Sequence, residues 1–152
     1  MASGPHAISD AEKGDWLQTR PGERCLIRVS AAETNGAYSV VEIVSSPGDS
    51  TPMHVHQNED EHFVVLEGTA RIACGEKTFD AAAGAAVSLP RHIPHAWGNP
   101  SDTPLRLLAT CTPGGVEEVL RLIATGGDID MMALSEAVGV RIVGPLLLAV
   151  KI

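Results

Sequence analysis

Between Cys25 and Thr110, short apolar segments alternate with turn residues, and this pattern constrains the fold more than any other feature of the chain. The segments are rich in β-branched residues, and turn sequences such as Asn35-Gly36 and Gly75-Glu76 separate them. Many short strands with turn signals at close intervals are typical of an all-β sandwich or barrel. A length of 152 residues indicates one domain that can bury a substantial core.

The strands that we expect are Cys25–Val29, Tyr38–Val44, Phe63–Leu66, Ala70–Cys74 paired with Lys77–Phe79, Ala85–Leu89, His95–Trp97 and Leu105–Thr110. After Thr112 the pattern becomes helical. Val116, Val119, Leu120 and Ile123 recur at the spacing of an amphipathic helix. Gly126-Gly127 would end that helix, and a second helix is expected over Met131–Val138.

These elements define one domain with three parts. Residues 1–22 would form an N-terminal arm, in which Ile8–Leu17 forms a short helix or lies on the barrel or on a partner subunit. Residues 23–112 would form the barrel, and residues 113–152 a C-terminal extension of helices and tail that caps it.

Charge and composition exclude several classes of partner. The formal net charge of −8 is unsuited to nucleic acid or to an anionic membrane, because both require clustered Lys and Arg. The apolar run Pro145–Val150 is too short to span a bilayer. Cys25, Cys74 and Cys111 form no CxxC motif, and we expect small buried side chains in a reducing compartment. With no apolar leader at the start, a cytoplasmic protein is expected.

Two histidines near the middle of the chain indicate a metal site. His54 and His56 would face the same side of a strand, because side chains alternate between the two faces. The acidic run Glu59-Asp60-Glu61 follows them and offers a nearby carboxylate. Imidazole and carboxylate together suit a transition metal. A further ligand should come from a distant strand, and His95, which opens one, is the best candidate.

The two regions carry gapped motifs of a known family. Gly48-x5-His54-x-His56-x4-Glu61-x6-Gly68 resembles the first cupin motif, with every defining position filled. Gly84-x5-Pro90-x-His92-x2-His95-x3-Asn99 resembles the second, although His92 stands where the family usually has glycine. The short spacing between them, and the helices that follow, are similar to small bacterial single-domain cupins of the quercetin dioxygenase-like type.

This resemblance implies a double-stranded β-helix, the cupin jelly-roll barrel, with a short C-terminal helical extension. It also implies that one divalent transition metal ion (Fe, Mn, Ni, Co, Zn or Cu) is bound by His54, His56, Glu61 and His95. Motif spacing selects Glu61 from the acidic run, with Glu59 or Asp60 as the alternative. His62 would point away from the metal. His92 would be a surface or structural histidine, or else a substrate contact or fifth ligand.

Candidate pocket residues follow from strand parity and from where cupins often contact substrate. Phe63 shares parity with Glu61, and Trp97 shares parity with His95. Met53, Tyr38 and Arg28 complete the set, and core packing is an equal explanation for the apolar members. By resemblance, the chain would form a homodimer.

The function that this resemblance implies first is a metal-dependent dioxygenase that acts on a small enol or phenolic substrate, with Glu61 as metal ligand and general base. A metal-dependent isomerase, lyase or decarboxylase would need the same Lewis acid but no oxygen. A non-catalytic cupin that binds a small molecule is the third possibility, because one fold supports many activities.

Overall fold

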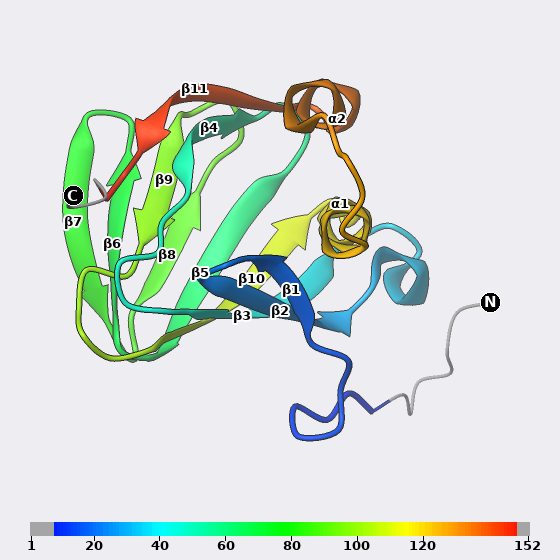
Figure 1. The fold of residues 1–152 in the computed structure, drawn as a ribbon, viewed down its shortest axis with the longest axis horizontal. Helices are drawn as coiled ribbons and strands as arrows, with labels where there is room; N and C mark the ends of the chain where they lie inside the picture. Colours follow the sequence, from blue (N-terminus) through cyan, green and yellow to red (C-terminus); the bar gives the residue numbers. More distant parts are fainter. Residues whose placement is uncertain (1–7, 149–152) are drawn as a thin grey trace.

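The computed structural model describes residues 8–148, whose strands form two antiparallel sheets facing each other (Figure 1). The six-stranded sheet has the order β1 (Leu17–Arg20), β2 (Glu23–Val29), β3 (Ser39–Ser45), β10 (Leu105–Thr112), β5 (Asp60–Glu67) and β8 (Ala86–Leu89). The five-stranded sheet has the order β11 (Val140–Leu146), β4 (Pro52–His56), β9 (His95–Gly98), β6 (Thr69–Cys74) and β7 (Lys77–Ala82). The expected double-stranded β-helix is confirmed.

Alternating burial along the strands explains why the two sheets pack together. In β10, Leu105, Leu107, Ala109 and Cys111 are buried, while the residues between them are only partly covered. A strand of period two presents one apolar face, and that face must be buried against a second sheet. Phe63 of one sheet meets Trp97 of the other edge to face, with ring centroids 6.0 Å apart.

The N-terminal segment differs from one of its two expected forms. Residues 8–16 form turns and irregular structure rather than a helix, and β1 begins at Leu17. The Asp10 carboxylate accepts a hydrogen bond from the backbone N–H of Glu12, and the Asp10 carbonyl accepts one from Lys13. Local bonds of this kind compete with helix formation. The short helix predicted for this segment is therefore wrong.

The C-terminal extension contains both predicted helices and an additional strand. The helices α1 (Val116–Ala124) and α2 (Met131–Val138) confirm the sequence prediction, and Gly139, with φ of 75°, follows α2. The chain then enters β11, which pairs with β4. Strands therefore occur on both sides of the 23–112 range expected for the barrel. Residues 1–7 of the expected arm and 149–152 of the expected tail lie outside the described residues.

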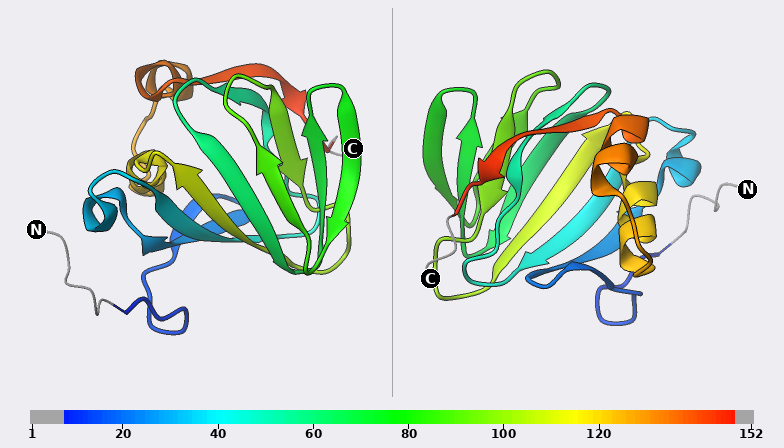
Figure 2. Two further views of the ribbon diagram at one scale, coloured as in Figure 1. Left: turned by 180° about the vertical axis from the view of Figure 1, so that it is seen from behind. Right: turned by 45° about the horizontal axis from the view of Figure 1, so that its top comes forward.

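The two helices cover the open side between the sheets (Figure 2). Helix α1 packs against β1, at one edge of the six-stranded sheet, and α2 packs against β11, at one edge of the five-stranded sheet. A short 3-10 helix, η1 (Ala31–Thr34), precedes β3. Within residues 8–148, no helix has the length and apolar character needed to cross a membrane.

Gly68, between β5 and β6, offers a test of how closely this turn packs against the backbone of Pro104. Its φ is +80°, and a Cβ there would lie 2.5 Å from the backbone oxygen of Pro104. We expect Gly68→Ala to lower the free energy of unfolding by about 2–4 kcal/mol, because backbone strain and a steric clash add together. Urea denaturation measures this difference.

Gly84→Ala is the matched control, because its φ is +95° but no atom lies within 4 Å of the added Cβ. It should cost only the backbone strain, about 1–2 kcal/mol. Equal losses in the two variants would show that the close approach at Pro104 is absent in solution.

Candidate metal centre

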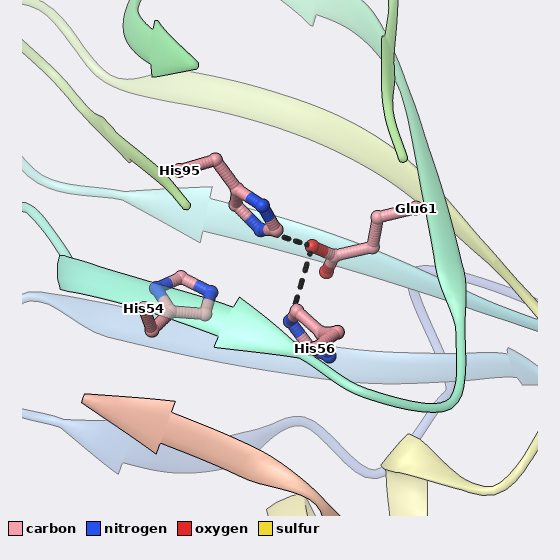
Figure 3. A group of neighbouring side chains, drawn as sticks. All are labelled: His54, His56, Glu61 and His95. Atoms are coloured by element: carbon pink, nitrogen blue, oxygen red, sulfur yellow. Dashed lines mark hydrogen bonds and ion pairs between the residues drawn. The ribbon is translucent and has the colours of Figure 1, made fainter. Parts of the chain in front are cut away.

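Three histidines on two neighbouring strands converge on one point (Figure 3). His54 and His56 project from the same face of β4, and His95 opens β9 directly opposite His54 in the antiparallel register. The ring centroid of His54 lies 5.1 Å from that of His56 and 4.5 Å from that of His95. The rings of His56 and His95 are nearly parallel, with centroids 5.2 Å apart.

Glu61 reaches the same point from the opposite sheet. It lies on β5, which follows β4 after a short turn, and its Oε2 lies 3.0 Å from Nε2 of His95 and 3.5 Å from Nε2 of His56. One nitrogen from each ring and one Glu61 oxygen all lie within 4.8 Å of one another. The expected four residues, His54, His56, Glu61 and His95, are therefore brought together.

The three acids of the run 59–61 have separate roles. Glu59 Oε1 lies 2.6 Å from Nδ1 of His56. Asp60 accepts hydrogen bonds from the backbone N–H and from Nε of Arg91, at 2.9 and 3.2 Å. Glu61 alone of the three belongs to the cluster. Asp60 faces the other side of β5, because side chains alternate along a strand, and Glu59 precedes that strand. Glu59 instead orients one of the rings.

Hydrogen bonds at Nδ1 orient the imidazoles so that their Nε2 atoms face the cluster. His54 Nδ1 lies 2.8 Å from the Pro52 carbonyl oxygen, and His95 Nδ1 lies 3.3 Å from that of Ile93. A carbonyl can only accept, so Nδ1 of His54 carries the proton and Nε2 of that neutral ring keeps its lone pair. Nε2 of His95 instead lies 3.0 Å from Oε2 of Glu61, and a metal ion bound there would displace the proton of that hydrogen bond. Nδ1 bonds to carbonyls and carboxylates are the usual way that metal-binding histidines are oriented.

Nε2 of His56 is buried and has no hydrogen-bond partner among the described residues. An unsatisfied buried nitrogen costs about 1–3 kcal/mol, and a metal ion beside it would remove that cost. Three imidazole nitrogens and one carboxylate oxygen are a donor set for a divalent transition metal. The residues present therefore fit the metal that the sequence motifs imply.

The members of the cluster shift one another's pKa values in different directions. Burial acts to raise the pKa of Glu61, but the hydrogen bond from His95 and the nearby imidazoles outweigh it and lower the pKa to about 2. Burial, aided by His95, lowers the pKa of His54 to about 4. Burial acts in the same direction on His56, but Glu59 and Glu61 reverse it and raise its pKa. At neutral pH, Glu61 is thus charged and His54 neutral.

A cavity of about 220 Å³ opens onto this cluster. Its walls are mostly apolar and come from both sheets and both helices. Apolar side chains that line it include Val41, Ile43, Trp97, Val116, Val119, Leu120, Ile123, Val138, Val140 and Ile142. The amphipathic face predicted for α1 is the face that it presents to the cavity.

The five candidate pocket residues are placed differently from one another. Trp97 lines the cavity. Phe63 does not line it but is fully buried in the core, where its ring contacts Trp97. Met53 alternates with His54 on β4 and lies against Gly144 of β11. Tyr38 precedes β3 and is 41% exposed. Arg28 pairs with Glu42 at 3.4 Å and lines a separate surface pocket near residues 8–17.

His62, His92 and the three cysteines lie where they do not complete the cluster. His62 is exposed and lies 3.0 Å from the Ser88 hydroxyl. His92 is exposed, has φ of 67° and donates its backbone N–H to the His56 carbonyl. Cys25 and Cys111 are buried thiols that line the cavity, and Sγ of Cys111 lies 4.0 Å from Oε1 of Glu61. Burial raises the pKa of the Cys111 thiol.

Two charged residues in the cavity wall were not expected from the sequence. Arg20 ends β1 and Glu23 begins β2, on the two sides of Pro21-Gly22. That Pro-Gly pair is a turn signal, and it could have predicted a hairpin with charged residues at its tip.

Comparisons with known proteins agree with this fold. Residues 41–111 match the family model described as the Cupin domain. Mannose-1-phosphate guanylyltransferase RfbM of Salmonella typhimurium is 31% identical over 118 residues, which cover 76% of this chain and 25% of the relative. The chain therefore spans about a quarter of the length of that protein.

Two solved structures illustrate the likeness of fold. An RmlC-like cupin from Shewanella frigidimarina has a TM-score of 0.66 and 20% identity, with 78% of this chain and 99% of that chain covered. The polyketide cyclase RemF from Streptomyces resistomycificus has a TM-score of 0.63 and 20% identity, with 70% and 78% covered. The matching cupin domain and the cupin-fold structures together support assignment of this chain to the cupin superfamily.

Proposed function

We propose that this protein is a metal-dependent dioxygenase for a small enol or phenolic substrate, similar to quercetin dioxygenase-like cupins. The observation that carries the proposal is the mostly apolar cavity that opens directly onto His54, His56 and Glu61, three of the four residues of the cluster. A flat, mainly apolar molecule with one oxygen to place at the metal matches both the walls and the cluster.

The cavity suits a sugar phosphate less well. Among the described residues that line it, Arg20 is the sole Lys or Arg, and its guanidinium already contacts Asp49 and Glu23. Phosphate binding normally uses free cationic groups or backbone N–H groups at a helix start. The sugar phosphate named for RfbM therefore gives little guide to this site. The name of RemF indicates a polyketide, which is closer to an enol or phenol.

A divalent transition metal held by His54, His56, Glu61 and His95 would supply a Lewis acid and, if redox-active, a means of activating O2. The chain itself supplies the rest. Glu61 is charged at neutral pH and can accept the proton of an enol or phenol. The apolar side chains of α1, α2 and β11 keep water away, and the indole of Trp97, which is 4% exposed, forms part of the apolar wall.

We also propose that the protein works in the cytoplasm as a homodimer. All three cysteines are unpaired, which suits a reducing compartment. On the outer face of β5, Val64 and Leu66 are 40% and 44% exposed, and a second copy could cover them. Light scattering on the purified protein would measure the oligomeric state.

An isomerase, lyase or decarboxylase is the second candidate, because Glu61 can act as a base without oxygen. RemF, a cyclase by name, has a similar fold and shows that ring-forming proteins share it. Product formation under argon would separate this candidate from a dioxygenase. A non-catalytic binding cupin would bind the same compounds with no product in either atmosphere.

Removal of two imidazoles should abolish metal binding. We expect elemental analysis to find one divalent metal ion per wild-type chain and almost none in His54→Ala/His95→Ala, because two of four ligands are gone. His62→Ala is the matched control, since this exposed histidine adjoins Glu61 in sequence but lies outside the cluster. Full metal content in the double variant would show that the site assignment is wrong.

Glu59 should affect metal affinity without being a ligand. Its hydrogen bond to Nδ1 of His56 orients that ring, so we expect Glu59→Gln to weaken metal binding about ten- to a hundredfold. A competition titration with a chelating dye measures this change. Glu76→Gln, in the exposed turn between β6 and β7, should leave the affinity unaltered. Equal affinities for the two variants would contradict an orienting role.

Oxygen uptake tests the proposed reaction directly. We expect metal-loaded protein to consume O2 with flavonols, β-diketones or catechols. Glu61→Gln should lower the rate about a hundredfold or more, because the proton acceptor is lost. An oxygen electrode gives the rate, with His62→Ala as the control. Absence of metal-dependent uptake with all three classes would count decisively against a dioxygenase.

A further inference from the structure

The cavity has a second polar region, separate from the four metal-site residues. Arg20 donates from Nε and Nη2 to the two carboxylate oxygens of Asp49, at 2.7 and 2.9 Å. Nη2 also lies 2.9 Å from Oε2 of Glu23. The Ser45 hydroxyl donates to Asp49, and the Thr19 hydroxyl donates to Glu23, each at 2.6 Å. The guanidinium is therefore held rigidly in place.

This region lies beside the aromatic wall of the cavity. Trp97 follows His95 by two residues on β9 and faces the same side, about 7 Å along the strand. Cζ of Arg20 lies 5.3 Å from the Trp97 ring centroid, in a cation–π contact. A molecule bound in the cavity beside this wall would thus have the metal-site residues and the guanidinium both within reach.

Arg20 retains a donor for a ligand. Nε and Nη2 are occupied by Asp49 and Glu23, but within residues 8–148 nothing accepts a hydrogen bond from Nη1. The side chain lines the cavity and keeps 28% of its surface accessible. Buried or partly buried N–H groups normally find an acceptor, and the contents of the cavity can supply one.

The charges around Arg20 restrict the kind of acceptor. Two carboxyl groups, on Glu23 and Asp49, surround one guanidinium, so an added anion would approach an arrangement that is already more than neutralised. A neutral oxygen, such as a hydroxyl or carbonyl, gains the hydrogen bond without that repulsion.

We propose that Arg20 is a specificity-determining residue, which donates a hydrogen bond from Nη1 to a neutral oxygen on the substrate beside Trp97. The inference rests on the proposed function, in which the reacting enol or phenol oxygen of the substrate faces the metal site. It adds a second oxygen to the substrate class: a small enol or phenol that carries a hydroxyl or carbonyl group on the part remote from the reacting oxygen.

Three catechols that differ only in one substituent test this inference. They carry an ethyl, a hydroxyethyl or a carboxymethyl group, and calorimetric titration of metal-loaded protein under argon gives each Kd without turnover. We expect the hydroxyethyl compound to bind about tenfold more tightly than the ethyl compound, since one hydrogen bond to a charged donor is gained. The carboxymethyl compound should bind more weakly than the hydroxyethyl compound.

Arg20→Gln should remove the preference for hydroxyethyl over ethyl while leaving the Kd of the ethyl compound within about twofold, because only the distal contact is lost. If Arg20→Gln folds poorly because Asp49 has lost its partner, the double variant Arg20→Gln/Asp49→Asn replaces it, since an asparagine at that position carries no charge. Arg24→Gln is the matched control, because Arg24 is exposed on β2 and stacks on Trp16. A purely structural role for Arg20 would instead weaken all three compounds equally.

The inference is overturned if wild-type protein binds the ethyl and hydroxyethyl compounds equally. It is also overturned if the preference survives in both Arg20 variants, or if no catechol binds. These binding measurements do not depend on oxygen uptake. If the ethyl and hydroxyethyl compounds bind equally but O2 is still consumed, only the role of Arg20 is rejected. A clear preference without O2 consumption would reject the dioxygenase and retain the binding contact.

Discussion

The pairing of His54 with His95 across β4 and β9 is the contact on which the rest of the site depends. It fixes two imidazoles at a separation that the antiparallel register dictates, and His56 follows from the alternation of β4. Glu61 then closes the cluster from the other sheet, which is possible only because the sheets pack face to face. Core contacts such as Phe63 against Trp97 keep the distance between the two sheets constant.

The metal-site residues could be predicted from sequence because local rules place them. Strand alternation and motif spacing are properties of short segments, and His54, His56, Glu61 and His95 each lie on a strand with a clear pattern. The same holds for α1 and α2, whose apolar spacing or glycine ends are visible in the sequence. Similarity to quercetin dioxygenase-like cupins stays a prediction.

The cavity walls could not be predicted in the same way. β1 has the polar sequence Leu17-Gln18-Thr19-Arg20, and Gly144-Pro145 interrupts the pattern of β11. Arg20 meets Asp49 across 29 residues of sequence, a contact that only the folded sheet creates. Arg28 was expected at the pocket because it lies on an early strand, but it is three residues from Cys25 and therefore faces the other side of β2.

One continuous stretch of the chain, 116–142, supplies the cavity wall formed by α1, α2 and the start of β11, whereas all four metal-site residues come from earlier strands. The candidate metal site and this part of the cavity wall are thus encoded in separate parts of the chain. An insertion, deletion or exchange within this stretch could alter which molecules fit while the four metal-site residues remain. Within a single barrel, the fit of a bound molecule and the holding of a metal can in this way change separately.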